Sequence, residues 1–566
     1  MSQESIPQLF RQQVRVGGHR PALREKRLGR WQTTSWTTWA QRSERVAAFL
    51  VAHGVGVGDR VVILSPTRQA WVEADVGVLL AGAVTVPVYP TVPAEQIHDI
   101  VSRVGATAAL VSDPLLAEKL LLDRSSAEKL RAVIVFDPRG LRALPDEQGR
   151  RALEIGDLSP LASGGPIVSL EDVYAAEHPF VSEREKAISD DALAAVLFTS
   201  GTSGAPRGVM LTHRNFVSQI HAIEKLMGLG PHDEQLLFLP LAHVFGKMLE
   251  IAQIGVGFTT SFAESTSTAV DDILDVNPTF FGSVPRLFEK IHAAALQRAK
   301  AEGQLKAKAL SWAFDVGQKV AALKREDKDI PLALRVQHKL ADDQVLSRVR
   351  ARFGSRLRFA LSGGAPLSEE LATWFDAAGV TILEGYGLTE TAAQTHVNQP
   401  ARRKLGTVGP SVPGVEAKLA DDGEILVRGP NLMRGYWNDP AATSASIDSD
   451  GWFHTGDVGT IVGGMLKITD RKKDIIVTAG GKNIAPQNIE EMLRRSPLIA
   501  DAALFGDGRP YVVALVSLES NRSRSGLVEN GRSNRSARAR ERPRGSSSSA
   551  NRDRRRKSKA RIVRRP

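Results

Sequence analysis

The sequence predicts an α/β protein with a large N-terminal domain of mixed and parallel sheets, an added β unit, a small C-terminal α+β domain and a disordered basic tail. Short apolar runs alternate with helical stretches, which is typical of parallel sheets covered by helices. A charged break at residues 470–474 sets off a compact α/β segment that ends near Leu518. Residues 520–566 hold almost no apolar side chains, so they cannot bury enough surface to fold alone. We expect domains at 1–470 and 471–519, with the tail at 520–566.

The first mixed α/β unit is expected between Trp31 and Asp113. The apolar spacing of Ser43–Val51 indicates a helix, and Gly54 follows it as a stop signal. Val76–Gly82 is apolar all round and directly precedes a strand-like run. A loop rich in Asp, Gly and Pro is expected around Asp137–Gly165. Short apolar runs predict strands at four places: Val61–Leu64, Val84–Tyr89, Ala108–Val111 and Val133–Phe136.

The second half of the chain opens with a long helical stretch, Phe288–Leu346, rich in Ala, Lys, Arg and Glu. Its wide polar face is typical of a helix surface that faces solvent. A further helix is expected at Ser368–Phe375. The strand-like run Glu424–Gly429, with turns around Pro410 and Gly414, indicates a smaller β unit.

Composition places the chain among ordinary globular proteins, because 42% of its 566 residues are hydrophobic and 24% are charged. The absence of cysteine excludes disulfides and thiolate metal sites. Residues 1–20 are polar and lack the apolar core of a signal peptide. No apolar run approaches the ~20 residues that a membrane helix needs. We therefore expect a soluble, cytoplasmic protein.

The net charge of +11 comes from the tail. Residues 521–566 contain 17 basic and 3 acidic side chains, a net +14, which leaves −3 for residues 1–520. A basic tail of this kind would suit an anionic lipid surface or a nucleic acid. Peripheral contact at the inner membrane surface is therefore an alternative to a purely cytoplasmic protein, whereas no specific nucleic-acid partner is expected.

A glycine-rich loop from Phe198 to Gly208 is the most informative segment of the chain. It follows the apolar run Leu193–Phe198 and precedes the strand-like run Val209–Leu211. Glycine lets backbone amides approach an anion closely, and hydroxyls and a cation can then surround a polyphosphate. The alternative is a Ser/Gly surface turn between two strands. The segment Phe198–Gly208 is not a P-loop, because it lacks the Gly-Lys-Ser/Thr sequence that opens a helix in that motif. The candidate phosphate-binding residues are Thr199, Ser200, Gly201, Thr202, Ser203, Gly204 and Arg207.

Five further motifs follow the loop. Four of them have structural alternatives. Leu239–Gly246 could be a core-to-loop transition, Leu361–Pro366 a strand-to-helix turn, and Glu384–Glu390 a turn with its tyrosine packed inward. Glu384–Glu390 offers a flat aromatic face, hydroxyls and a hard oxygen ligand suited to Mg²⁺. His454–Asp457 puts a carboxylate at a tight turn, where ribose hydroxyls commonly bind. The last, Asp470–Asp474 with the loop after it, could equally be a solvated domain boundary.

The six motifs, in this order, resemble the adenylate-forming superfamily, which includes acyl-CoA synthetases, firefly luciferase and peptide-synthetase adenylation domains. The form Leu-Pro-Leu-Ala-His at residues 239–243 resembles the long-chain acyl-CoA synthetases. The family usually carries Lys where this chain has Arg207, and the two cations are not equivalent. The long helical stretch also resembles an insertion of long-chain members, which favours a long-chain substrate.

The resemblance implies the roles of individual residues. Thr199, Arg207, Thr389, Glu390 and Lys473 would be catalytic, with Lys473 as the hinge of a mobile C-terminal domain and Thr199 and Glu390 as Mg²⁺ ligands. The acyl pocket would hold His243 and Phe245, and Gly480 and Gly481 would face the CoA thiol channel. The remaining residues would bind the nucleotide: Ser200, Gly201, Thr202, Ser203, Gly204, Gly363, Gly364, Ala365, Glu384, Gly385, Tyr386, Gly387, Asp457 and Arg471.

The activity implied is an ATP-dependent ligation that uses Mg²⁺ and coenzyme A. A long-chain fatty acid would become acyl-AMP and then acyl-CoA, releasing pyrophosphate and AMP. The main alternative is a fatty acyl-AMP ligase that loads a carrier protein, but the insertion typical of those enzymes is missing between Val458 and Asn483. A luciferase-like oxidation has no feature to support it.

The end of the chain departs from the family pattern. Members carry a late C-terminal lysine that serves adenylation, and nothing after Leu518 resembles that segment. The break falls within a strand, so a frameshift is our preferred interpretation, which makes the C-terminal domain incomplete. An adenylation-deficient protein that still binds nucleotide, or a non-catalytic binding protein, is the remaining alternative.

Overall fold

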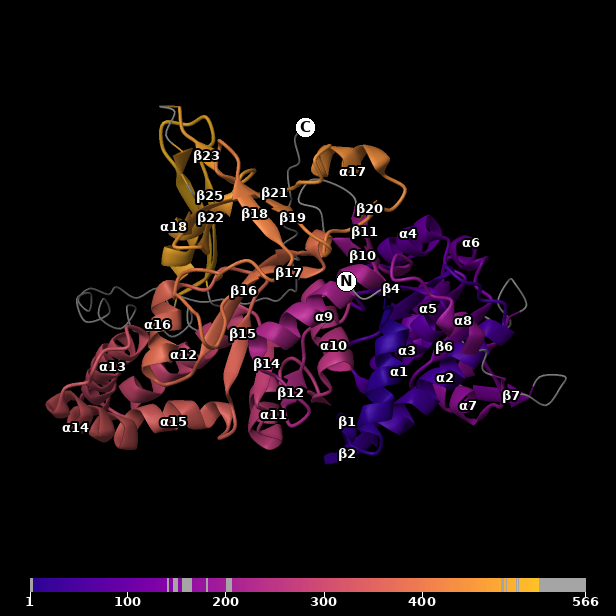
Figure 1. Ribbon diagram of the computed structural model, residues 1–566, viewed down its shortest axis with the longest axis horizontal. Helices are drawn as coiled ribbons and strands as arrows, with labels where there is room; N and C mark the ends of the chain where they lie inside the picture. Colours follow the sequence, from indigo (N-terminus) through magenta and orange to yellow (C-terminus); the bar gives the residue numbers. More distant parts are fainter. Residues whose placement is uncertain are drawn as a thin grey trace, which may run out of the picture. The chain divides into compact units, whose positions relative to one another are not determined.

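The computed structural model describes residues 4–139, 142–145, 151–154, 165–179, 182–199, 206–479, 483–484, 486–494, 496 and 498–518. The chain divides into two compact units, Met1–Ile475 with Asn483–Ala485, and Ile476–Lys482 with Pro486–Pro566. In the described residues, the larger unit contains two eight-stranded sheets and a four-stranded sheet, drawn with their helices in Figure 1. This architecture confirms the predicted α/β class.

The first large sheet carries the beginning of the glycine-rich loop. Its order is β20-β11-β10-β4-β3-β5-β6-β9, and the run from β10 to β9 is parallel, whereas β11 and β20 are antiparallel neighbours. All four predicted N-terminal strands are confirmed in it. The strands are β3 (Arg60–Leu64), β4 (Val84–Val88), β5 (Ala108–Val111), β6 (Ala132–Val135), β9 (Ile167–Ser169), β10 (Leu193–Thr199), β11 (Arg207–Thr212) and β20 (Gly435–Tyr436).

The helices beside this sheet follow the expected pattern. The predicted helix at Ser43–Val51 lies inside α2 (Trp36–Ala52), and the apolar stretch before β4 belongs to α3 (Gln69–Leu80), which is buried along its whole length. The loop expected around Asp137–Gly165 is only partly a loop, because an antiparallel hairpin forms within it. Its strands are β7 (Arg142–Pro145) and β8 (Arg151–Glu154).

The second large sheet positions most of the other motifs. Its order is β17-β16-β15-β14-β12-β13-β1-β2, parallel from β16 to β1, with β17 and β2 antiparallel at the edges. The strands are β1 (Pro21–Arg27), β2 (Arg30–Ser35), β12 (Glu234–Leu237), β13 (Thr259–Phe262), β14 (Phe280–Ser283), β15 (Phe359–Ser362), β16 (Ile382–Leu388) and β17 (Ala393–Val397). Two helices pack on each other beside it, α9 (His213–Met227) and α10 (Val244–Val256).

A buried ion cluster connects α10 to α3. Lys247 on α10 contacts Asp75 on α3 and, at 2.9 Å, Glu250 one turn along its own helix, and all three side chains are almost completely buried. Its ammonium also lies 5.0 Å from the centre of the Trp71 ring. A buried charge needs such partners, because an unpaired one is strongly destabilising.

The long helical stretch is confirmed, but two breaks divide it. Gly303, with a φ of 108°, separates the first two helices, and Pro331 precedes the third. The helices α13 and α14 lie against each other, and α12 and α16 pack on α13 (Figure 1). The elements are α12 (Pro285–Ala301), α13 (Gln304–Arg325), α14 (Leu332–Ala341), the π-helical turn η1 (Asp342–Leu346), α15 (Ser347–Arg350) and α16 (Glu369–Ala377).

The predicted β unit is also confirmed, as a four-stranded antiparallel sheet of order β18-β19-β21-β22. Its strands are β18 (Glu416–Leu419), β19 (Glu424–Arg428), β21 (Phe453–Val462) and β22 (Met465–Arg471). The smaller unit holds β23 (Ile476–Val477), α18 (Pro486–Arg494) and the antiparallel pair β25 (Ile499–Phe505) and β26 (Val513–Leu518). The predicted tail, 520–566, lies outside the described residues.

The remaining elements are helices outside the long helical stretch and one short strand. None of the helices in the described residues combines the length and the apolar character needed to cross a bilayer. These elements are α1 (Ile6–Gly17), α4 (Ala94–Val104), α5 (Pro114–Leu121), α6 (Arg124–Ala127), α7 (Leu170–Ala175), α8 (Ser182–Lys186), α11 (Ala269–Val276), η2 (Ala351–Phe353), η3 (Thr389–Thr391), α17 (Pro440–Ser446) and β24 (Asn483–Ile484).

Candidate functional site

The two ends of the glycine-rich loop face each other across neighbouring strands. Thr199, the last residue of β10, pairs in register with Arg207, the first residue of β11. The Thr199 hydroxyl donates to the Arg207 carbonyl oxygen at 3.5 Å. The antiparallel pairing of these two strands is compatible with both the phosphate-binding and the surface-turn interpretations. The loop residues Ser200, Gly201, Thr202, Ser203 and Gly204 lie outside the described part of the chain.

Arg207 and Glu390 are brought together by a residue that the sequence did not single out, Tyr436 on β20. The Arg207 guanidinium lies 5.4 Å from the centre of the Tyr436 ring and 3.9 Å from the carboxylate of Asp439. The Tyr436 hydroxyl donates to Oε1 of Glu390 at 2.9 Å. Burial and the adjacent Glu390 raise the pKa of Tyr436, so the phenol remains a donor. Arg207 itself is exposed.

A second cluster joins three predicted residues from three different motifs. Tyr386 on β16 donates its hydroxyl hydrogen to Oδ2 of Asp457 at 2.6 Å, and Arg471 approaches the other carboxylate oxygen at 3.2 Å. Asp457 and Arg471 face each other because they are register partners on β21 and β22. Burial raises the pKa of Asp457, and the hydrogen bond from Tyr386 and the charge of Arg471 oppose that change. The carboxylate is thus held in place by two donors.

The turn after β16 is tightly constrained. A side chain at Gly387 would place its Cβ 1.5 Å from the Ala393 carbonyl oxygen, so only glycine fits there. Ala392 and Ala393 both have positive φ angles, of 48° and 83°, which is a strained conformation for residues with a Cβ. Strain of this kind persists where the surrounding structure imposes it, and the turn carries Thr389 and Glu390.

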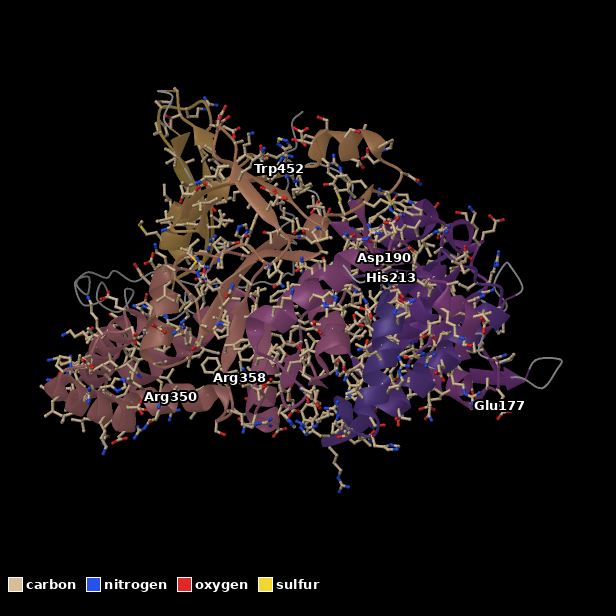
Figure 2. All side chains as sticks on the ribbon, viewed as in Figure 1. Glu177, Asp190, His213, Arg350, Arg358 and Trp452 are labelled. Carbon is tan, nitrogen blue, oxygen red and sulfur yellow. The ribbon has the colours of Figure 1, made fainter. Side chains whose placement is uncertain are left out.

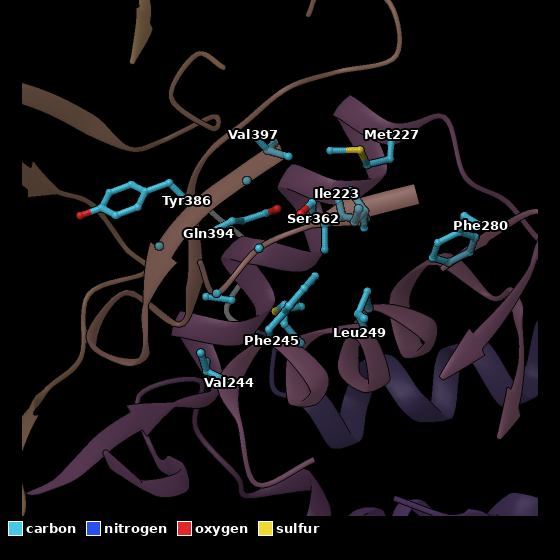
Figure 3. A pocket seen from close by; sticks show the side chains of 18 of the residues that line it. Ile223, Met227, Val244, Phe245, Leu249, Phe280, Ser362, Tyr386, Gln394 and Val397 are labelled. Carbon is cyan, nitrogen blue, oxygen red and sulfur yellow. The ribbon is translucent and has the colours of Figure 1, made fainter. Parts of the chain in front are cut away.

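An apolar cavity opens beside these motifs (Figure 3). Glycines of two motifs and Tyr386 contribute to its lining, together with side chains that come mainly from α9, α10, β14 and β17. In Figure 3, Tyr386 lies toward one end and Phe280 toward the other, with Phe245 and Leu249 between them. The lining residues are Ile223, Met227, Leu229, His243, Val244, Phe245, Met248, Leu249, Ala252, Phe258, Phe280, Leu361, Ser362, Gly363, Gly364, Gly385, Tyr386, Gly387, Ala393, Gln394 and Val397.

His243 caps the helix that forms one wall of the cavity. Its Nδ1 accepts from the backbone N–H of Phe245 at 3.2 Å, at the N-terminus of α10. The surrounding protein lowers the pKa of His243, although more than a third of the residue surface is exposed. A neutral imidazole also follows from the hydrogen bond, because an acceptor nitrogen carries no proton. His243 and Phe245, the residues expected in the acyl pocket, both line this cavity.

The other predicted residues lie near the cavity or at the edge of the larger unit. Ala365 is exposed just beyond the glycine pair, and Glu384 is buried in β16. Lys473 is exposed and belongs to the larger unit, two residues before that unit ends at Ile475. Gly480 and Gly481 lie outside the described residues.

The donor set fits a magnesium ion that a nucleotide brings with it. No group of three or more His, Asp or Glu side chains that could hold a metal is found among the described residues. Mg²⁺ usually keeps several waters and takes one or two protein oxygens together with substrate phosphates. Glu390, oriented by Tyr436, and the hydroxyl of Thr199 are suitable oxygens for such a partial shell.

Comparisons with known proteins agree with this geometry. A family model described as "AMP-binding enzyme" matches residues 10–437, and one described as "AMP-binding enzyme C-terminal domain" matches residues 473–533, past the predicted end of that domain at 519. The chain is 37% identical to the long-chain-fatty-acid–CoA ligase FadD15 of Mycobacterium tuberculosis, over 87% of this chain and 78% of the relative. It is 30% identical to the human long-chain-fatty-acid–CoA ligase 1, over 90% of this chain and 72% of the relative.

Solved structures show the same fold. ATP-bound MatB from Rhodopseudomonas palustris matches with a TM-score of 0.66 and 23% identity, over 93% of this chain and 92% of that one. A fatty acyl CoA synthetase from Mycobacterium tuberculosis matches with a TM-score of 0.60 and 22% identity, over 94% and 91% of the two chains. From the extent of the family match and the length shared with the curated relatives, the chain belongs to the AMP-binding enzyme family.

Proposed function

We propose that this protein is an ATP-dependent ligase that converts a long-chain fatty acid to acyl-CoA through acyl-AMP, releasing pyrophosphate and AMP. The observation that carries the proposal is the continuity of the cavity. Its lining combines residues of the nucleotide motifs, Gly363, Gly364 and Tyr386, with apolar side chains of α9, α10 and β14. Relatives at 30–37% identity are long-chain-fatty-acid–CoA ligases, which supports the same substrate class.

The cavity sorts substrates by their apolar length. A carboxylate at the glycine-rich mouth leaves its alkyl chain between α9, α10 and β14. Each buried methylene contributes about 0.8 kcal/mol, or roughly fourfold in affinity, until the cavity is full. A short acid forgoes most of this free energy, so the site favours long chains.

Adenylation requires two anions to meet, and the site supplies positive charge for it. The fatty-acid carboxylate oxygen attacks the α-phosphorus of ATP, and pyrophosphate leaves with the electrons of the broken P–O bond. Arg207 lies beside the loop that would hold the phosphates, and Thr389 lies on the strained turn, in η3, which contacts β11. Fixed charges and donors of this kind lower the barrier because they need no reorganisation during reaction. Magnesium bound with ATP, held by Glu390 and Thr199, would neutralise part of the phosphate charge.

The second cluster suits the sugar of the nucleotide. Asp457 is buried, and its carboxyl group is held in place by Tyr386 and Arg471. Such a carboxylate accepts hydrogen bonds from ribose hydroxyls. Tyr386 also lines the cavity, so the sugar site and the acyl cavity share one side chain.

Thioester formation is proposed for the same site after a domain rotation. The CoA sulfur attacks the carbonyl carbon of acyl-AMP, and AMP leaves. Lys473 is our proposed hinge, with Gly480 and Gly481 in the CoA channel, and the domain bounds 1–470 and 471–519 belong to this proposal. A protein of the cytoplasm with peripheral contact at the membrane is proposed as its setting.

Measuring the two half-reactions separately tests the proposal. ATP–pyrophosphate exchange with acids of graded length should rise with chain length, and supplied acyl-AMP plus CoA should give acyl-CoA. Exchange that is equal for acetate and a long-chain acid would contradict the assigned substrate. If the late lysine is missing, adenylation should be much slower than thioester formation. Normal adenylation would overturn that interpretation without affecting the substrate class.

A further inference from the structure

Helix α14 exposes an apolar ridge. Leu332, Val336 and Leu340 recur every fourth residue, so they follow one another along one side of the helix. They are 76%, 64% and 54% exposed, respectively. Single exposed apolar residues are common on protein surfaces, but three in line on a short helix form a continuous strip.

The packing of α14 explains why the ridge faces away from the protein. Ala341 is buried, Leu334 is half-buried, and the neighbours of the helix are α13 and η1. On a helical wheel, Leu334 and Ala341 lie opposite the ridge. One side of α14 thus packs against the protein, and the other side has no protein partner among the described residues.

Positive charge accompanies the ridge. Arg335 and Lys339 are exposed and lie beside it on the wheel, and α14 contains no acidic residue. Residues 285–350 carry 14 basic and 8 acidic side chains, a net +6. Residues 1–520 have a net charge of −3 in total, so residues 1–284 and 351–520 together have a net charge of −9. The cationic surface of the folded part is therefore concentrated on these helices.

We propose that the exposed face of α14 (Leu332, Arg335, Val336, Lys339 and Leu340) docks on an anionic lipid bilayer. An interfacial helix places an apolar strip at the boundary of headgroups and acyl chains while its cations meet lipid phosphates. Neighbouring α13 also exposes two large apolar side chains, Leu305 at 85% and Trp312 at 38%. The assignment goes beyond the proposed ligation, and a bilayer is also where a long-chain fatty acid dissolves.

A bilayer suits this face better than a protein partner does. A helix of ten residues is about 15 Å long. A stable protein interface needs about 800 Å² from each partner, usually with a complementary groove. Shallow insertion into lipid needs only a convex apolar strip with cations beside it, and α14 offers both.

The chain has no cysteine, so a single introduced cysteine can carry a fluorescent label at one chosen position. We would label Val336→Cys with an environment-sensitive dye and add phosphatidylcholine vesicles with or without about 30% phosphatidylglycerol. The matched control is Leu115→Cys on α5, where the native side chain is 76% exposed, compared with 64% for Val336. We expect a blue shift at 336 with anionic vesicles and none at 115. An unchanged signal at 336 would overturn the proposal, even if the basic tail bound the vesicles.

A second variant separates the ridge from the tail. Leu332→Ser, Val336→Ser and Leu340→Ser together should weaken flotation with anionic vesicles by about tenfold or more in about 0.5 M salt, where electrostatic binding by the tail is screened. An unchanged circular-dichroism spectrum would show that the fold survives. Equal flotation of both proteins would refute the role of α14. If the fluorescence of the dye at position 336 shifted with purified acyl carrier protein and did not shift with vesicles, the partner of α14 would be a protein and the lipid proposal would be wrong. None of these measurements depends on ligase activity. A failure of the lipid-docking proposal can therefore be distinguished from a failure of the proposed function.

Discussion

Substituting Gly282 by Ala should shorten the acyl chain that the enzyme prefers. Gly282 lies on β14, where a Cβ would fall 2.5 Å from Cδ1 of Leu249 and 3.1 Å from Cζ of Phe245. Carbon atoms pack at about 3.5–4.0 Å, so Leu249 must move by roughly 1 Å or more. Both displaced side chains line the cavity, and their movement reduces the space for the substrate.

The size of the effect follows from the methylene groups excluded. Losing room for one or two of them costs about 0.8–1.6 kcal/mol of binding, or roughly 4- to 15-fold. We expect kcat/KM for the longest acids to fall by that factor, with little change for medium-length acids and for ATP. The measurement is a series of acids of graded length, with thermal melts to follow stability, because overpacking typically costs about 1–3 kcal/mol.

Gly255→Ala on α10 is the matched control. Its Cβ would fall 2.1 Å from Cγ2 of Ile220 on α9, so this variant also overpacks against α10. Neither Gly255 nor Ile220 lines the cavity. We expect a lower melting temperature with an unchanged chain-length profile. If both variants changed the profile alike, or if Gly282→Ala left it unchanged, the assignment of the cavity to the acyl chain would be wrong.

Three further predictions concern charge. Glu390→Ala should reduce acyl-AMP formation by about a hundredfold or more, because an oriented carboxylate for magnesium is lost; normal pyrophosphate exchange with an intact circular-dichroism spectrum would remove Glu390 from the site. Asp457→Ala should weaken ATP binding in calorimetry and leave fatty-acid binding intact, whereas equal loss of both would indicate misfolding. His213, labelled in Figure 2, accepts a hydrogen bond from the Ile6 N–H on Nδ1, and complete burial, with the nearby Lys247, lowers its pKa to about 3. The unfolded chain then binds the extra proton below its pKa of about 6.5, so stability present at neutral pH is lost as pH falls toward 3. Melting temperatures between those limits should fall less steeply for His213→Gln, and equal slopes would refute this contribution.

Parallel strands were the best-predicted part of the fold. Runs such as Val61–Leu64 and Ala108–Val111 are buried on both faces, so their continuous apolar character is visible without knowledge of their neighbours. The hairpin of β7 and β8 was missed because its sequence is polar and contains a proline, which the prediction took as loop signals. The breaks at Gly303 and Pro331 were visible as residues, but their effect depends on how the helices pack.

The site was partly predictable for a related reason. The motifs and the family resemblance identified Tyr386, Asp457 and Arg471 individually, but only the pairing of β21 with β22 shows that the last two meet. Tyr436 lies in a two-residue strand without a distinctive motif, and its contact with Glu390 depends on the antiparallel pairing of β20 with β11. The buried cluster around Lys247 was likewise invisible, because a lone lysine in an apolar helix does not reveal its partners on α3.

The most direct test of the joint site is calorimetric binding of sulfamoyl-adenosine analogues that carry acyl chains of increasing length. These analogues present the nucleotide and the alkyl chain together, in the arrangement of acyl-AMP. We predict that affinity rises by roughly fourfold per methylene, the increment for burying one such group, and then levels off when the cavity is full. Asp457→Ala should weaken every analogue by a similar factor. Affinities that are independent of chain length would contradict the account, because the apolar cavity would then not receive the acyl group of a bound adenylate.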